Sequence, residues 1–400
     1  MKELTGKYGT AKVFTDLVEE KALSQIGTLL DQEFVKDSKI RIMPDVHAGA
    51  GCTIGTTMTI TDKVCPNLVG VDIGCGMHVT NLGKTELDLE KLDKFIRNNI
   101  PSGFNIRTEP HMYIGFIPLH KLLRCKDHVD IDRARLSLGT LGGGNHFIEV
   151  DKDDDGNLYL VIHSGSRHLG LEVATYYQRL AEEQVCGRDK ESVQKLIEDL
   201  KAQGRHSEIQ SALANLKAST TTIPKELAYV SGQLFDDYIH DMAVVQRYAR
   251  YNQVAMMDEI LRYIDAHEID EFVTVHNYID PVDMTLRKGA VSAHKGERLL
   301  IPINMRDGSL ICVGKGNPDW NYSAPHGAGR LMSRSEARKK FTVDEFTESM
   351  NGIYTTSVGN ETLDECPMAY KPMESIVNNI KDTVKIEKII RPIYNFKAGE

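Results

Sequence analysis

The sequence predicts an α+β fold with β-sheets at its centre and helices around them. Short apolar runs broken by many glycines, typical of strands joined by tight turns, occupy residues 39–82. Apolar residues at helical spacing dominate about 170–266, and strand-like runs return after that segment. No internal repeat or low-complexity linker separates independent units. We therefore expect residues 1–400 to form a single domain, with a mostly helical insertion or layer at about 170–266.

A helix and a hairpin are expected in the first half of the chain. A helix is expected at 84–100, after the glycine-rich strands. Residues 146–150 (HFIEV) and 158–163 (LYLVIH) are rich in β-forming side chains and flank the turn-forming stretch DKDDDGN, which predicts a hairpin. In the second half, strands are expected at EFVTVH, ERLLIPIN, GSLICVG and the tail VKIEKIIRPIYNF.

Composition is that of an ordinary soluble protein, with 41% hydrophobic and 26% charged residues in a chain of 400. The N-terminus lacks the apolar stretch of a signal peptide, and no apolar run is long enough to cross a bilayer. The seven cysteines form no CxxC pair, as expected where thiols stay reduced. We therefore expect a cytoplasmic protein with no membrane partner.

Charge is distributed unevenly along the chain. The formal net charge of −9 argues against a protein that coats DNA non-specifically. Residues 287–340 nevertheless carry eleven Lys or Arg against four acids. This segment could bind a polyanion such as RNA, or it could simply be a solvated face.

Five potential metal ligands lie at strand ends or in glycine-rich turns: Asp72, Cys75, His146, His163 and His276. Imidazole, thiolate and carboxylate together suit a borderline divalent ion, so manganese, zinc and cobalt are all admitted. In the expected hairpin, His146 and His163 occupy the open end, where directly opposed positions are about 5 Å apart. The competing interpretation is that the cysteine is buried packing and the histidines are surface residues.

Several motifs are excluded. Asp151, Asp153 and Asp155 resemble the start of a calcium-binding EF-hand loop, but its twelfth position is Ile162 and its flanks look like strands. There is no GxxxxGK[ST] phosphate loop and no Lys-x-Asp-Gly signature. If the protein binds a nucleotide, it must therefore do so without either of these motifs.

Taken together, six segments resemble the RtcB family of RNA ligases: GVDIGCGM, LGTLGGGNHFIEV, HSGSR, HNY, LRKGAVSA and SAPHGAGRLMSR. The resemblance runs from MPDVH near residue 43 to Lys397. It implies an RtcB-like fold and an enzyme that uses GTP and manganese. Such an enzyme joins RNA with a 2′,3′-cyclic phosphate or 3′-phosphate end to RNA with a 5′-hydroxyl end.

The resemblance also implies a reaction sequence. His326 becomes guanylylated, GMP passes to the RNA 3′-phosphate to give RNA-(3′)pp(5′)G, and the 5′-hydroxyl then displaces GMP. Cyclic ends are hydrolysed first. Broken RNA, from tRNA splicing or from damage, is the expected partner, and an archease-like activator is a second one.

Specific residues follow from the same resemblance. One manganese would be held by Cys75, His163 and His276, and the other by Asp72, His146 and the bridging Cys75. The expected catalytic residues are His326, Cys75, Asn145, Arg167, Arg330 and Arg334. The expected GMP pocket comprises Asn145, His146, Phe147, Ile148, Glu149, His276, Asn277, Pro302, Ile303, Asn304, Met305, Ser309, His326, Gly327, Ala328, Gly329 and Lys397.

Chemistry supports two of these assignments. Glu149 could accept from the N1 and N2 donors of guanine, which adenine lacks. The planar forks of the three arginines suit phosphate oxygens at RNA ends, although structural ion pairing is the alternative. The sequence departs from the family at Ile303 and Asn304, where smaller residues are usual, and at Gln253, where an arginine is expected after Asn252.

Two other functions compete with RNA ligation. A dinuclear metal-dependent phosphoesterase acting on RNA would use similar ligands and arginines, but it would need no nucleophilic His326. A non-catalytic RNA-binding protein could use the basic segment 287–340. Its aromatic residues, only 7% of the chain, are not clustered with those charges, which is poor for base stacking.

Overall fold

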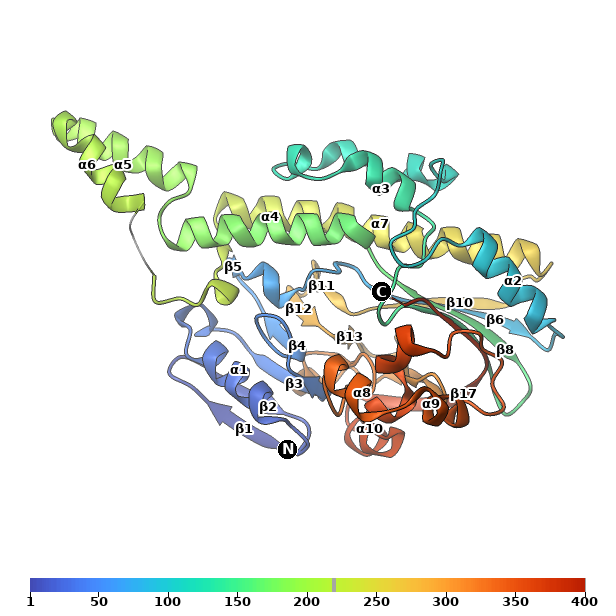
Figure 1. Cartoon of the computed structure of the whole chain (residues 1–400). Helices are drawn as coiled ribbons and strands as arrows, with labels where there is room; N and C mark the ends of the chain where they lie inside the picture. The colour runs from blue at the N-terminus through green and yellow to red at the C-terminus, as the bar shows by residue number, and fades with distance from the viewer. Residues whose placement is uncertain (218–220, 400) are drawn as a thin grey trace.

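The computed structural model describes residues 1–217 and 221–399, and it confirms a mixed fold in which sheets lie beneath a layer of helices (Figure 1). A six-stranded sheet has the order β1-β2-β3-β4-β12-β11. Its strands are β1 Lys2–Thr5, β2 Thr10–Val13, β3 Ile40–His47, β4 Ile54–Thr59, β12 Thr285–Lys288 and β11 Asn277–Asp280. Helix α1 (Glu20–Leu30) packs its buried Ile26 and Leu29 into the same apolar core as β2 and β3.

A seven-stranded antiparallel sheet has the order β10-β6-β8-β7-β17-β15-β14. Its strands are β10 Asp270–Val275, β6 Gly76–Gly83, β8 Leu158–Ser164, β7 Phe147–Lys152, β17 Val384–Lys397, β15 Gly308–Gly314 and β14 Arg298–Asn304. The two edge strands approach each other, because the amide of Leu300 donates to Thr274 Oγ1 at 3.0 Å. The sheet is therefore nearly closed around a small apolar cluster.

The expected hairpin of β7 and β8 is confirmed, with Phe147 opposite His163. The four strands expected in the second half of the chain are also present, as β10, β14, β15 and β17. The helix expected at 84–100 is α2 (Leu89–Asn99), and it begins later than predicted. Asp88 sets its start, because the carboxylate accepts from the Lys91 amide as an N-cap.

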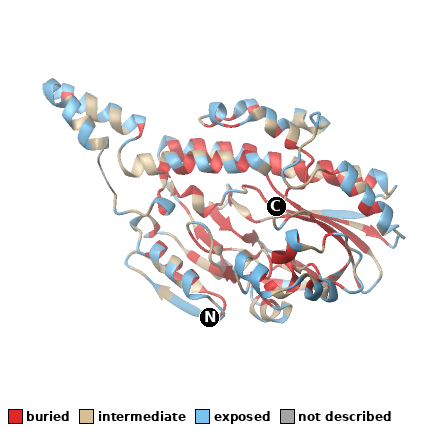
Figure 2. Ribbon diagram, in the orientation of Figure 1, coloured by how far each residue is buried: buried red, intermediate tan, exposed pale blue. Residues whose placement is uncertain are grey.

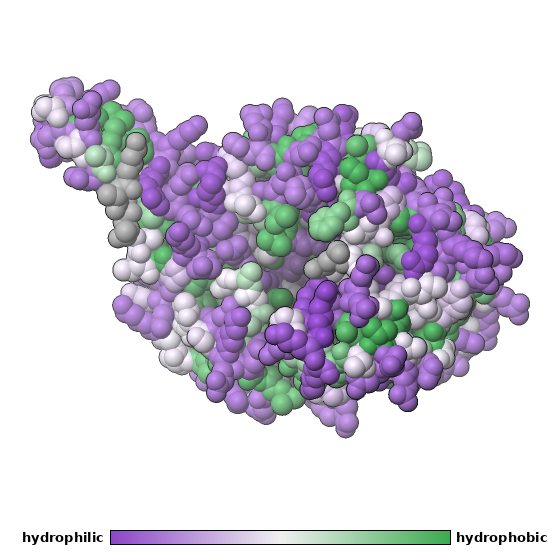
Figure 3. Space-filling model, viewed as in Figure 1, coloured by the Kyte–Doolittle hydropathy of each residue, from purple (hydrophilic) through white to green (hydrophobic). Residues whose placement is uncertain are grey.

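The expected helical layer consists of α4 (Arg167–Val185), α5 (Lys190–Ala202), α6 (Ile209–Lys217) and α7 (Gln233–Tyr263). Helices α4 and α7 run side by side above the sheets, and their buried faces share one apolar core with β2, β3 and β4 (Figures 1 and 2). Helices α5 and α6 project away from this body and are mostly exposed. On the face drawn in Figure 3, hydrophobic side chains form only separate patches.

Short elements complete the fold. They are the pairs β5 (Lys63–Val64) with β9 (Val230–Ser231) and β13 (Ala290–Ser292) with β16 (Ser323–Pro325), and helices α3 (Ile131–Ser137), α8 (Arg334–Lys340), α9 (Val343–Ser349) and α10 (Met373–Asn379). Within residues 1–217 and 221–399, none of the helices has the length and apolar character needed to span a membrane.

Candidate metal centre and adjoining cavity

The five expected metal ligands meet at one end of four neighbouring strands. Asp72 and Cys75 lie in the turn before β6, and His146 immediately precedes β7. His163 lies near the end of β8, and His276 immediately follows β10. Since β10, β6, β8 and β7 are consecutive in the sheet, their register brings all five side chains together.

The ligand atoms of this cluster lie close to one another. Cys75 Sγ is 3.4 Å from His146 Nε2 and 3.3 Å from His163 Nε2. Asp72 Oδ2 is 3.0 Å from His146 Nε2, and the Nε2 atoms of His163 and His276 are 3.5 Å apart. The cluster is buried except for part of Asp72. Cys75 therefore lies between the Asp72–His146 pair and the His163–His276 pair.

Hydrogen bonds fix the tautomers of two histidines. His146 Nδ1 lies 2.9 Å from the Leu141 carbonyl, and His163 Nδ1 lies 3.2 Å from the Asn145 carbonyl. A carbonyl oxygen only accepts, so each Nδ1 carries the proton and each Nε2 turns a lone pair toward Cys75. This is the usual outer-shell arrangement of metal-binding histidines, and the donor set fits a divalent ion such as manganese, zinc or cobalt.

Burial shapes the electrostatics of the cluster. It raises the pKa of the Cys75 thiol well above its ordinary value, and it lowers the pKa of His163 and His276. Neutral imidazoles are what a metal needs, but a thiolate in this setting requires a cation beside it. The Ser166 amide and hydroxyl donate to Asp72 Oδ1, which leaves Oδ2 directed at the cluster.

A second group of potential ligands is Asp280, Asp283 and His294. Arg287, whose side chain is completely buried, lies within ion-pair distance of both carboxylates. Arg287 therefore offsets part of the negative charge of this group.

His326 lies beside the metal cluster, in the loop after β16. Its ring centroid is 4.9 Å from that of His276. His326 Nδ1 is 2.6 Å from Asp45 Oδ2, and the His326 backbone amide donates to the same oxygen at 3.1 Å. With Nδ1–H donated to Asp45, His326 Nε2 keeps a free lone pair and can act as a nucleophile.

Sequence analysis missed Asp45, which lies in β3 with no exposed surface. The sequence signal that could have indicated Asp45 is the presence of an acidic residue inside the otherwise apolar run MPDV. Lys371 Nζ donates to the carbonyls of Pro44 and Val46 at 3.1 and 3.0 Å, and so fixes the backbone on both sides of Asp45.

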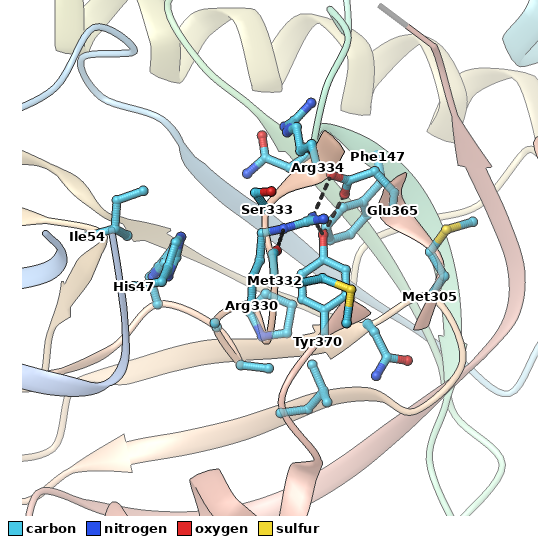
Figure 4. Close-up of a pocket in the computed structure, with 18 of the residues that line it drawn as sticks. His47, Ile54, Phe147, Met305, Arg330, Met332, Ser333, Arg334, Glu365 and Tyr370 are labelled. Atoms are coloured by element: carbon cyan, nitrogen blue, oxygen red, sulfur yellow. Dashed lines mark hydrogen bonds and ion pairs between the residues drawn. The ribbon is translucent and has the colours of Figure 1, made fainter. Parts of the chain in front are cut away.

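A cavity of about 840 Å³ is lined in part by His326, and Figure 4 labels other residues of its wall. Most of the expected nucleotide residues line it: Asn145, Phe147, Glu149, Pro302, Ile303, Asn304, Met305, His326, Gly327, Ala328, Gly329 and Lys397. This volume is in the range of cavities that hold small molecules and cofactors.

Other expected nucleotide residues lie outside the cavity wall. His146 and His276 belong to the metal cluster. The expectation for Ile148 needs correction, because alternate residues of a strand face opposite sides and Ile148 packs in the core behind β7. Asn277 instead donates to the Asp72 carbonyl, and Ser309 is buried within the sheet.

The wall also contains residues that the sequence did not indicate: His47, Glu365, Tyr370 and Asn395. Glu365 accepts from Lys397 Nζ at 2.5 Å and from the Tyr370 hydroxyl at 2.6 Å. Burial opposes ionisation of Glu365, but the neighbouring cations, with Lys397 foremost, hold its pKa at about 2. His47 lies in the quoted segment MPDVH but was given no role there, whereas Glu365, Tyr370 and Asn395 lie in no motif that the sequence analysis identified.

The three expected RNA-binding arginines differ in position. Arg330 and Arg334 line the cavity and pair with Glu365 at 3.2 and 3.6 Å (Figure 4). Arg167, at the start of α4, instead donates to Thr140 Oγ1 and the Gly103 carbonyl. In the basic segment 287–340, Arg287 and Lys288 are buried, so the segment is not one continuous charged surface.

The departure at Gln253 has a clear structural role. Its Nε2 donates to the Gly76 and Ser164 carbonyls at 2.9 and 2.7 Å, which ties together β6 and β8 beside Cys75. Asn304 hydrogen-bonds Asp307 at the turn between β14 and β15, and Ile303 is largely buried.

A buried cluster of potential metal ligands, an oriented histidine and a large adjoining cavity together have the features of an enzyme active site. The family described as tRNA-splicing ligase RtcB matches residues 31–115 and 119–398. The RNA-splicing ligase RtcB of Escherichia coli K12 is 30% identical over 435 residues, covering 95% of each chain. The tRNA-splicing ligase RtcB of Aeropyrum pernix is 27% identical over 463 residues, covering 94% of this chain and 91% of that protein. The chain belongs to the RtcB family of RNA ligases.

Replacing the sulfur at the centre of the cluster should abolish metal binding. We expect Cys75→Ala to weaken Mn²⁺ affinity by about 100-fold or more, because the residue contacts two of the other ligands. Electron paramagnetic resonance of free Mn²⁺ during titration measures the affinity. Cys312→Ala, a buried cysteine in β15, is the control and should bind normally. Unchanged affinity in Cys75→Ala would show that the cluster is not the metal site.

Proposed function

We propose that this protein is a GTP- and manganese-dependent ligase that joins RNA 2′,3′-cyclic phosphate or 3′-phosphate ends to 5′-hydroxyl ends. The observation that carries the proposal is the position of His326. Its Nδ1 is held by Asp45, its ring contacts that of the metal ligand His276, and it lines the large cavity. A nucleophile, a metal centre and a nucleotide-sized space therefore meet at one point.

In the first step, His326 Nε2 attacks the α-phosphorus of GTP. A nitrogen–phosphorus bond forms, the bond to the β-phosphate oxygen breaks, and pyrophosphate leaves. Asp45 keeps the ring in the productive tautomer and stabilises the positive charge that develops on it. Bound divalent ions would withdraw charge from phosphate oxygens and so make phosphorus more electrophilic.

In the RNA steps, a 3′-phosphate oxygen attacks the phosphorus on His326, and GMP moves to the RNA end while the histidine is released. The 5′-hydroxyl oxygen of the second RNA then attacks the RNA phosphate, and GMP leaves. A cyclic phosphate first opens by addition of water. Arg330 and Arg334 are the expected phosphate contacts from the cavity wall, where each already pairs with Glu365.

The cavity also offers contacts that distinguish guanine. Glu149 and Lys397 lie on adjacent strands and both line the cavity, with Phe147 between the metal cluster and Glu149 along β7. A Glu149 carboxylate would accept from guanine N1–H and N2–H, and Lys397 would donate to the guanine oxygen. Adenine has an acceptor at N1 and a donor in place of the oxygen, so these contacts favour GTP over ATP.

A phosphoesterase acting on RNA would share the metal centre but would have no use for the Asp45–His326 pair. The names of the relatives, RNA-splicing and tRNA-splicing ligases, also support ligation. Splicing or repair of broken RNA is therefore the role that we propose for the enzyme, with an archease-like activator as a further proposed partner.

Incubation with α-³²P-labelled GTP and Mn²⁺ should leave a protein-bound label that is acid-labile and alkali-stable, as expected for a phosphoramidate. His326→Ala should remove the label, because the attacking nitrogen is lost. His294→Ala is the matched control, since this histidine bonds Asp283 outside the cavity and should label normally. Absence of any label on the wild-type protein, under conditions where it binds Mn²⁺, would refute the proposal.

Asp45→Asn should slow guanylylation by about 100-fold while leaving the Kd for GTP nearly unchanged, because the amide cannot stabilise a charged His326 ring. Single-turnover labelling gives the rate, and calorimetry with GMP gives the affinity of the pocket. Asp62→Asn, in an exposed turn, is the control and should label at the wild-type rate. A wild-type rate in Asp45→Asn would mean that Asp45 has no part in the chemistry.

A further inference from the structure

Two carboxyl groups lie together inside the curved seven-stranded sheet. Glu149 and Asp151 are two residues apart on β7, so their side chains share one face of the strand. Glu149 is 3% exposed and Asp151 is not exposed at all. Each carboxyl group shifts the pKa of the other, so the two groups are electrostatically coupled. This face of the sheet is otherwise largely apolar, with Val161, Ile311 and Ile390 among its side chains.

The hydrogen bonding of the two groups is unequal. Glu149 lines the cavity and accepts from Asn395 Nδ2 at 2.5 Å. Both carboxyl oxygens of Asp151 are buried, and among the described residues no donor reaches either of them. A buried carboxylate without donors is unfavourable, whereas a neutral carboxylic acid carries a proton that it can donate.

The surrounding charges leave Asp151 without a cation. On β17, Lys397 acts on Glu149, but its Nζ is bonded to Glu365. Lys388, on the same strand, pairs with Asp153 and Asp155 in the hairpin turn. On β8, Tyr159 lies opposite Asp151, but its hydroxyl donates to Asp153. Among the described residues, Glu149 is therefore the one ionisable group that acts on Asp151.

We propose that Asp151 is a positioning residue that stays protonated and donates its proton to Glu149, so that the pair holds one negative charge and Glu149 presents an acceptor to the nucleotide base. This inference rests on the proposed function, because the base is the guanine of GTP. The shared proton serves specificity: only an ionised Glu149 accepts from both N1–H and N2–H of guanine.

The pH should control whether Glu149 can accept hydrogen bonds from the base. Burial raises the pKa of Glu149 to about 7 and raises that of Asp151 well above its ordinary value, and the neighbouring Glu149 raises it further. Above pH 7 the pair keeps one proton, on Asp151. As the pH falls below 7, Glu149 becomes protonated too, and the acceptor for guanine is lost.

The test measures GMP binding by calorimetry between pH 6 and 8, at constant Mn²⁺. Wild-type affinity should weaken as the pH falls through 7. Asp151→Leu removes the donated proton, so the midpoint should move up by about one unit and affinity at pH 7 should fall by about fivefold. Asp151→Asn keeps a donor and should stay within about twofold of wild type. Asp155→Asn, at an exposed turn position, controls for loss of an acidic side chain and should have no effect.

A wild-type affinity that does not change with pH, or an Asp151→Leu profile identical to that of the wild type, would overturn the inference. Infrared spectroscopy at pH 8 provides a reading that does not depend on nucleotide. The carbonyl band of a neutral carboxylic acid should be present in the wild type and absent in Asp151→Asn. Absence of the band in the wild type would overturn the inference that Asp151 stays protonated. Failure of GMP to bind at any pH, with the band present, instead rejects the proposed nucleotide site and leaves the protonated Asp151 standing.

Discussion

The structure depends on one constraint, which is the packing of several potential metal-ligand atoms around Cys75 inside the protein. The carbonyl bonds to His146 and His163 place the protons of these rings on the outer nitrogens, so the inner nitrogens and Cys75 Sγ crowd together within 3.3 to 3.4 Å. Cys75 can donate its thiol proton to only one of these nitrogens, so a cation between these atoms would stabilise the grouping. Metal binding would therefore stabilise the ends of β6, β7, β8 and β10 together, and it would couple this part of the fold to the reaction.

His326 contacts residues of both large sheets. Asp45, which orients His326, belongs to the six-stranded sheet, whereas His276 follows an edge strand of the seven-stranded sheet. Strand β7 extends the arrangement, because it begins beside a metal ligand, continues into the cavity wall at Glu149 and reaches the buried acid Asp151. One strand would thus link the proposed metal, nucleotide and proton chemistry, and small shifts between the sheets would disturb all three.

Local patterns in the sequence predicted the β7–β8 hairpin, the later strands and the helical layer, because alternation and helical spacing are local signals. The five potential metal ligands were predicted from their chemistry and from the family resemblance, and the structure brings them together. Asp45, Glu365 and Asn395 were missed, since each reaches the site through contacts between distant parts of the chain. Ile148 was included because residues 145–149 were carried over as a run, although strand alternation places it in the core.

The most direct test of the central claim is anomalous scattering from manganese in crystals grown with Mn²⁺ and GTP. The account predicts manganese peaks among Asp72, Cys75, His146, His163 and His276, with continuous density from His326 Nε2 to a phosphate. Manganese bound only at Asp280, Asp283 and His294, or an unmodified His326 beside a fully occupied centre, would contradict it.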